Sequence, residues 1–134
     1  MIREITQEIA ERTGFTLGTD LFFGVRPQTA PDRCVLVAFN GGGSSFFDLP
    51  DRRDQMVQIL ARSKDYTQAY DDSVAVWNAV QGLSGLVLEE IVAGEGWEVL
   101  AIEAVNPPQY IGPDERGRHE FSTNYIWRVK DASK

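Results

Sequence analysis

The sequence predicts an α+β fold in which two helices pack on one face of a mainly antiparallel sheet of about five strands, with a mixed sheet as the open alternative. The clearest observation is the stretch 117–130: alternate residues from His119 to Val129 are mostly aromatic or apolar, and the residues between them are mostly polar. Side chains alternate across a strand, so this pattern predicts a half-buried strand of about twice the usual length. By contrast, the segment 65–81 repeats its apolar residues at steps of three and four, as an amphipathic helix does.

Both predicted helices carry terminal residues that favour them. The first begins near the start of the chain, because three isoleucines share one helical face of residues 2–9, and Gly14 can take the left-handed conformation that ends a helix. In the second, Asp65 can cap the first turn, and Gln68 lies three residues later, as in a capping box.

The remaining strands are predicted from short apolar runs. Residues 21–25 and 34–39 indicate two strands, of which the second is buried on both faces, and about eight residues from Asp54 indicate a third. Trp97 to Val105 is a strand that ends before two prolines, and we expect it to form an antiparallel hairpin with the long strand. The segment 86–96 fits either a short helix or a strand, followed by a glycine loop.

The length of the last strand has two explanations. A strand that outruns its neighbours presents unpaired backbone donors and acceptors, which favour pairing with another chain. Alternatively, the strand simply spans a large sheet. The alternation of its side chains is the same in both cases, so the pattern leaves the two explanations equal.

Length and composition favour one soluble domain, residues 1–134: the chain is 43% hydrophobic and 25% charged, as ordinary globular domains are. No apolar run is long enough to cross a bilayer, and the polar start of the chain is unlike a signal peptide, so we expect it to stay in the cytoplasm where it is made. The one cysteine, Cys34, lies in an apolar run and is expected to be an inert buried thiol.

Charge is distributed unevenly along the chain, whose net charge is −7. Ten acidic residues and no lysine or arginine lie between Asp65 and Glu115. A protein that grips nucleic acid through its phosphates needs a basic stripe, so direct DNA binding is not expected. The acidic stretch is either a solvated surface or a surface with an electrostatic role.

Motifs for chemistry are scarce, and we expect no catalytic residue, no cofactor and no metal site. The one histidine, His119, lies near Asp114 and Glu120 in the sequence, so a small hydrolase using it as a general base is the alternative to weigh. The glycines at 41–43 lack the lysine and the spacing of a phosphate-binding loop. Beyond them, two adjacent phenylalanines cannot both point inward on a strand, so one is expected to face a partner.

Several segments together resemble the minor capsid and tail terminator proteins of long-tailed phages. The resemblance runs from about residue 2 to residue 130. The segments that carry it are the first helix, Leu21-Phe22-Phe23-Gly24, Pro27 to Pro31 before the run 34–39, Val57 to Ala69 leading into the second helix, and the ending Pro108 to Tyr125.

This resemblance implies a virion structural protein and not an enzyme. Such proteins form a six-membered ring that caps the finished tail tube, ends its polymerisation and offers a surface on which the head connector docks, and they are commonly monomers until they meet the tube. The implied partners are copies of the chain itself, the tube protein, the head connector and the DNA that passes through the channel without specific binding. The implied location is the virion tail at the head–tail junction, after assembly in the host cytoplasm.

A ring of one polypeptide needs a head-to-tail interface with two different faces. The candidates for contact with a neighbouring subunit or the tube lie in the loops 41–47 and 106–117 and at the start of the long strand: Phe46, Phe47, Tyr110, Asp114, Arg116 and Arg118. Three glutamates of the acidic stretch are predicted to line the channel and repel DNA phosphates: Glu89, Glu90 and Glu95.

Three alternatives to a tail terminator stay open at this point. A neck or head-completion protein of the connector is similarly small and ring-forming. The hydrolase that uses His119 belongs to another class. A host adaptor domain that binds one protein by strand addition would form no ring.

Overall fold

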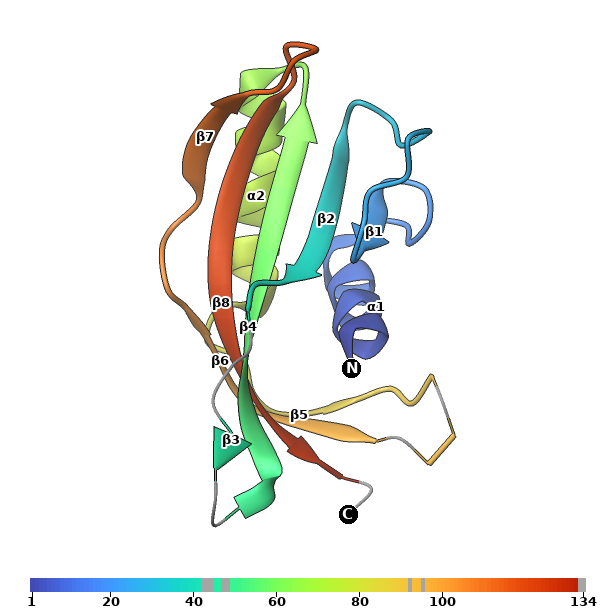
Figure 1. The fold of residues 1–134 in the computed structure, drawn as a ribbon, viewed down its shortest axis with the longest axis vertical. Coiled ribbons are helices and arrows are strands. Elements are labelled where there is room, and N and C mark those ends of the chain that lie inside the picture. The colour runs from blue at the N-terminus through green and yellow to red at the C-terminus, as the bar shows by residue number, and fades with distance from the viewer. Residues whose placement is uncertain (42–44, 47–48, 92, 95, 133–134) are drawn as a thin grey trace.

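The structure is a computed structural model that describes residues 1–41, 45–46, 49–91, 93–94 and 96–132 (Figure 1). Along the chain the elements are α1 (Ile2–Thr13), β1 (Leu21–Phe23), β2 (Cys34–Phe39), β3 (Ser45–Phe46), β4 (Leu49–Ser63), α2 (Tyr66–Val80), β5 (Ser84–Leu88), β6 (Trp97–Ala104), β7 (Gln109–Pro113) and β8 (His119–Asp131). Among the described residues, no helix is both long enough and apolar enough to span a bilayer.

Within the described residues the sheet has eight strands, in the order β1-β2-β4-β8-β6-β5, with β3 paired to β4 and β7 paired to β8. β1 and β2 run parallel and the other pairs run antiparallel, so the sheet is mixed and mainly antiparallel. The predicted α+β class with two helices is confirmed, but the prediction of about five strands is wrong. β3 and β7 were not predicted, and the segment that contains most of β5 was left open between a helix and a strand. All three strands are two to five residues long and too short for alternation to identify.

The long strand β8 is the centre of this sheet. One of its edges pairs with β4 from His119 to Lys130. Its other edge pairs first with β7, over residues 119–122, and then with β6, over residues 125–131. Both edges are therefore occupied by the same chain, so of the two explanations left open, the one in which the strand outruns its neighbours is wrong and the one in which it spans a large sheet is confirmed. The strand is long because two shorter strands share one of its edges.

The asparagine Asn106 fills the gap between β6 and β7 on that edge. Its side-chain Oδ1 accepts a hydrogen bond from the backbone N–H of Asn124 at 3.1 Å, and the backbone N–H of Val105 donates to the carbonyl of Asn124 at 2.7 Å. A side chain thus replaces the backbone partner that neither strand supplies, which keeps β8 paired across the break.

The predicted alternation of β8 is confirmed by burial. Tyr125, Trp127 and Val129 are buried, and they pack in one core with the inner residues of β2 and β4. The helices close the core with two buried residues each: Ile5 and Ile9 from α1, and Val76 and Val80 from α2. The residues between the buried ones, including Arg128, are partly exposed and alternate toward the outer face.

The helix ends match the sequence prediction in part. Gly14 takes the left-handed conformation at φ 84°, and its N–H donates to the carbonyl of Ala10. The Asp65 carboxylate caps α2 by accepting the N–H of Thr67 at 3.0 Å. Gln68 does not complete a capping box, because its side-chain amide donates to Asp72 at 2.9 Å.

Two strand predictions need correction. β4 is fifteen residues long and starts at Leu49, whereas the sequence predicts a strand of about eight residues from Asp54. The polar start of β4 favours a turn by its residue types, yet it pairs with the short β3 and with the end of β8. The ambiguous segment 86–96 begins as a strand, since β5 runs to Leu88.

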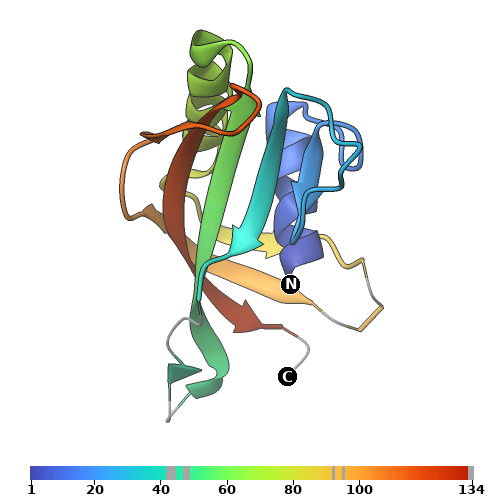
Figure 2. The ribbon, with the colours of Figure 1, turned by 45° about the horizontal axis from the view of Figure 1, so that its top comes forward.

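The sheet curls strongly, so the two helices are not laid side by side on a flat face. α2 lies across β4 and β8, while α1 lies beside β1 and β2, and β5 and β6 pass beneath α1 (Figures 1 and 2). Both helices contribute to the same core. The hairpin of β5 and β6 projects sideways from the rest of the molecule, away from the end where β7 turns into β8 (Figure 1).

Candidate interaction surfaces

The predicted interface residues fall at two separate ends of the long pair formed by β4 and β8. Phe46 belongs to β3, which pairs with the start of β4. Tyr110, Asp114, Arg116 and Arg118 lie on or beside the β7–β8 turn, next to the far end of β4 (Figure 1). Phe47, for which a partner-facing role was predicted, lies outside the described residues. The hairpin residues are brought together, and Phe46 is not.

Asp114 organises the β7–β8 turn. Its Oδ1 accepts the backbone N–H groups of Arg116 and Arg118, each at 2.9 Å, and its Oδ2 accepts the Nε–H of Arg118 at 2.7 Å. Burial alone would raise the pKa of Asp114, but the two amides and the Arg118 guanidinium outweigh burial and hold the pKa below its usual value. Asp114 therefore fixes the conformation of the turn, and this holds the backbone of Arg116 in a defined position.

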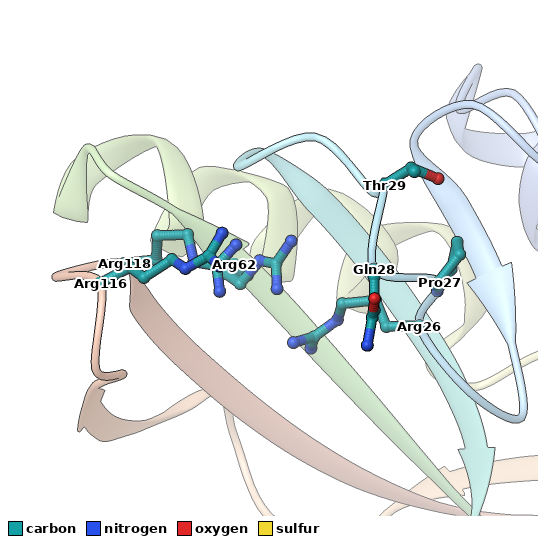
Figure 3. A pocket seen from close by; sticks show the side chains of 7 residues that line it. All are labelled: Arg26, Pro27, Gln28, Thr29, Arg62, Arg116 and Arg118. Atoms are coloured by element: carbon teal, nitrogen blue, oxygen red, sulfur yellow. The ribbon is translucent and has the colours of Figure 1, made fainter.

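A hollow of about 620 Å³ lies at this end of the molecule, and four arginines line it (Figure 3). Three segments that are far apart in the sequence form it: the loop after β1, the end of β4 and the β7–β8 turn. We call it the arginine hollow, and its lining residues are Arg26, Pro27, Gln28, Thr29, Arg62, Arg116 and Arg118.

Two of these arginines have carboxylate partners. Arg26 binds Glu120 at 3.0 Å, and Arg118 binds Asp114 at 2.7 Å and also approaches Asp32 at 3.6 Å. These carboxylates neutralise part of the positive charge. Arg26 keeps two further donors, Nε and Nη2, that are buried without a hydrogen-bond partner among the described residues.

Arg62 is the most unusual member of the group. It is 5% exposed, and it makes no ion pair with any described carboxylate. Instead, its Nη2 and Nε donate to the backbone carbonyls of Pro31 at 2.8 Å and Asp32 at 3.2 Å. Burial lowers the pKa of Arg62, and the nearby positive charges of Arg26 and Arg118 lower it further. A buried cation with no counter-ion is costly, so this site favours an anion from outside the subunit.

Arg26 and Arg62 were not predicted to be site residues. Arg62 ends the apolar part of β4 and pairs with Glu120 of β8 in the ladder, while Arg26 comes from a loop next to Pro27. A basic residue that closes an apolar strand run was the one available signal. No pattern along the chain indicated that these positions meet the β7–β8 turn.

A second surface, formed by this hairpin together with the start of α2, is aromatic. The rings of Tyr66, Tyr110 and Phe121 lie 5.1–5.3 Å apart, and Tyr70 adds to Phe121 at 5.5 Å. Three tyrosines of this cluster are still 39–49% exposed. Exposed aromatic side chains beside an edge strand are typical of a protein contact.

His119 belongs to this aromatic cluster and not to a catalytic arrangement of described residues. Its Nδ1 is 2.9 Å from the Tyr110 hydroxyl, and its ring packs edge-on to Tyr66. The two carboxylates proposed to assist it bind arginines instead: Asp114 binds Arg118, and Glu120, on the opposite face of β8, binds Arg26. In the described part of the chain no three histidine, cysteine or acidic side chains form a potential metal site.

The acidic candidates follow β5 on the projecting β5–β6 hairpin. Glu89 and Glu90 are exposed, and Glu95 lies outside the described residues. The pKa of Glu89 is raised, first by a hydrogen bond with the Glu11 carboxyl group and then by the negative charges of Glu11 and Glu8. Glu89 thus lies against α1 in a surface where like charges crowd together.

These features are typical of a protein that works through its surfaces: a sheet with projecting hairpins, a charged hollow and an exposed aromatic cluster. The chain belongs to a family of phage structural proteins, since residues 8–130 match the family described as bacteriophage tail terminator protein. The resemblance found in the sequence is confirmed, and the protein is a structural component of the virion tail.

A solved structure shares the fold. A chain in the structure entitled "Virion of native gene transfer agent (GTA) particle" superposes with a TM-score of 0.64 at 14% sequence identity, covering 91% of this chain and 84% of that one. Such a low identity establishes the common fold and no more. A search of curated proteins found no match.

Proposed function

We propose that this protein forms a ring on the end of the phage tail tube, where it stops polymerisation of the tube and offers a surface for the head connector. The observation that carries the proposal, beside family membership, is the difference between the two ends of the subunit. The arginine hollow and the aromatic cluster lie where β4 ends, and the β5–β6 hairpin with its glutamates projects elsewhere (Figures 1 and 2).

A head-to-tail ring requires this difference. Each subunit of such a ring presents one face to the neighbour before it and another face to the neighbour after it, and rotation closes the circle. The ring that the family resemblance implies has six subunits. The long β4–β8 pair gives the subunit a rigid axis, because twelve residue pairs connect these strands without interruption. Loops held at the two ends of such an axis keep a defined spacing.

The aromatic cluster is the surface that we assign to the tube protein. Tyr66, Tyr70 and Tyr110 are partly exposed on rigid supports, and the neighbouring β7 residue Ile111 is 53% exposed. β7 pairs with β8 along one edge. Aromatic side chains contribute large contact area at a low cost in conformational entropy. This suits an interface that forms only when the tube is complete and must then stay bound.

DNA must cross the ring without being held. A net charge of −7 per subunit gives the ring as a whole a negative potential, which repels phosphates. Head and connector proteins meet the ring from the side opposite the tube. In this arrangement the protein needs no cofactor.

The test is electron microscopy of particles made without this protein. Tails longer than normal and not attached to heads would support termination of the tube. Full heads without tails, beside tails of normal length, would favour a role in the neck and contradict the proposal.

A binding measurement tests the assigned tube surface. Tyr110→Ala should weaken binding of the purified protein to isolated tail tubes, because it removes an exposed ring of the aromatic cluster. Val25→Ala is the matched control, since Val25 is an exposed apolar residue outside the cluster, and this variant should leave binding unchanged. Equal binding by both variants would place the tube contact on another surface.

A further inference from the structure

The arginine hollow holds more positive charge than the described carboxylates around it neutralise. Four guanidinium groups line it, while three carboxylates lie within ion-pair distance of any of them: Asp32, Asp114 and Glu120. Arg62 is buried with only backbone carbonyls as partners, and two donors of Arg26 have none among the described residues. The hollow is therefore built to receive an anion that the subunit does not itself supply.

Another surface of the same chain carries an excess of negative charge. Glu89 lies against Glu11, close enough to hydrogen-bond when one of the two is protonated, and Glu8 adds a third carboxylate. Arg12 pairs with Glu8 at 2.7 Å, and no described cation pairs with Glu89 or Glu11. These carboxylates repel each other in the free subunit, and a cation from outside would relieve the repulsion.

The two surfaces also fit in shape. Glu89 and Glu90 directly follow β5, in the loop of the projecting β5–β6 hairpin, and the arginines line a hollow (Figures 1 and 3). We propose that the arginine hollow of one subunit receives Glu89 and Glu90, on the β5–β6 hairpin, from a second copy of this chain. This inference rests on the ring proposed above, because a contact between two different surfaces of identical chains is the head-to-tail kind.

A protein carboxylate suits the hollow better than a nucleic-acid phosphate. Asp32, Asp114 and Glu120 stand at or near its walls and would repel a long polyanion, and so would the net charge of the chain. A glutamate side chain brings one charge at a time and can bind a guanidinium through two hydrogen bonds. The contact gives Glu89 and Glu90 a partner in the neighbouring subunit, in place of the channel lining predicted from their charge alone.

Reciprocal charge reversal tests the contact. Arg116 is exposed and has no described ion-pair partner, so Arg116→Glu should leave the fold intact while placing a negative charge opposite the incoming glutamates. Glu89→Arg makes the converse change. Each single variant should weaken assembly of the full chain on isolated tail tubes about tenfold or more, measured by co-sedimentation with the tubes at low salt, and the double variant Arg116→Glu with Glu89→Arg should restore most of it.

Matched controls keep the comparison specific. Arg3→Glu and Asp71→Arg make the same charge changes at exposed positions outside both surfaces, and they should leave assembly on the tubes within about twofold of the unaltered chain. Thermal unfolding of each variant verifies its fold. A second measurement avoids charge reversal: Gln28→Cys with Glu90→Cys should yield disulfide-linked multimers on assembled tails, while each single variant should not.

The outcomes separate this contact from the proposed function. If tails have normal length with Arg116→Glu, and neither rescue nor cross-linking occurs, the contact is refuted while tube capping stands. If the unaltered chain neither associates nor limits tail length, the ring itself is wrong. Rescue by the double variant together with cross-linked multimers supports the contact, because no change within a single subunit would restore association.

Discussion

Arg33 and Asp72 form a two-bond ion pair between the loop before β2 and the middle of α2. The Arg33 Nε–Asp72 Oδ2 and Nη2–Oδ1 distances are both 2.9 Å. The Asp72 side chain is 5% exposed and also accepts a hydrogen bond from Gln68, whereas the Arg33 side chain is 54% exposed. The pair fastens the loop that leads to the arginine hollow onto a helix of the core.

Asp72→Asn should lower the free energy of unfolding by about 1–3 kcal/mol, because it removes the charge that accepts three hydrogen bonds in a buried position. Solvent screens the exposed guanidinium, so the lower half of this range is the expected one. Urea denaturation measures the change. Asp71→Asn is the matched control, since this neighbouring side chain is exposed and its change should stay within about 0.5 kcal/mol. Equal effects of the two variants would contradict the assigned role of the ion pair.

The β7–β8 turn should loosen in acid. The pKa of Asp114 is held below its usual value in the folded chain, so the ionised carboxylate stabilises the turn above about pH 4, the pKa of an aspartate in an unfolded chain, and this stabilisation is lost as pH falls through the folded pKa. The backbone N–H signals of Arg116 and Arg118 report the change directly, because both groups donate to Asp114. Their NMR shifts should titrate together below about pH 4. In Asp114→Asn they should not titrate, and an unchanged titration would assign it to another group.

Local patterns in the sequence were sufficient for several elements. The alternation in β8 and the Asp65 cap of α2 depend on neighbours within a few residues, so they could be predicted along the chain. The start of β4 could not be predicted in this way. Pro50 and the charged residues after it favour a turn, and pairing with β3 and β8 overrides that preference. β7 was missed for a related reason, since Gly112 sits at φ 104° at a register shift within the strand.

Only the part of the candidate site whose residues lie close together in the sequence could be predicted. Tyr110, Asp114, Arg116 and Arg118 lie on one hairpin, and a turn-rich sequence was enough to place them together. Arg26 and Arg62 join them only through the strand order, because β2 and β8 flank β4 on its two sides. Such long-range pairings leave no periodic trace along a single sequence, so the arginine hollow could not be predicted.

His119→Ala tests whether the histidine is structural or catalytic. Loss of the imidazole removes the hydrogen bond to Tyr110 and the ring contact with Tyr66, so the variant should be less stable by about 1–2 kcal/mol. Tail assembly should persist at a temperature where the variant stays folded. Phe121 packs against Tyr66 in the same cluster, so His119→Phe, which keeps a ring, should recover part of the stability. A hydrolytic activity that disappears in both variants would reinstate the enzyme alternative.

Anion binding by the arginine hollow should be measurable on the isolated subunit. Sulfate can take hydrogen bonds from several guanidinium groups at once, and binding to the folded state alone raises its stability by RT ln(1 + [L]/Kd), or about 1.4 kcal/mol at a tenfold excess over Kd. With ionic strength matched by chloride, sulfate should raise the unfolding temperature of the unaltered chain more than that of Arg116→Glu. Arg3→Glu should respond like the unaltered chain, since Arg3 lies on α1 and outside the hollow. Identical shifts in all three proteins would mean that sulfate acts through general exclusion from the surface, and that the four arginines do not form an anion site.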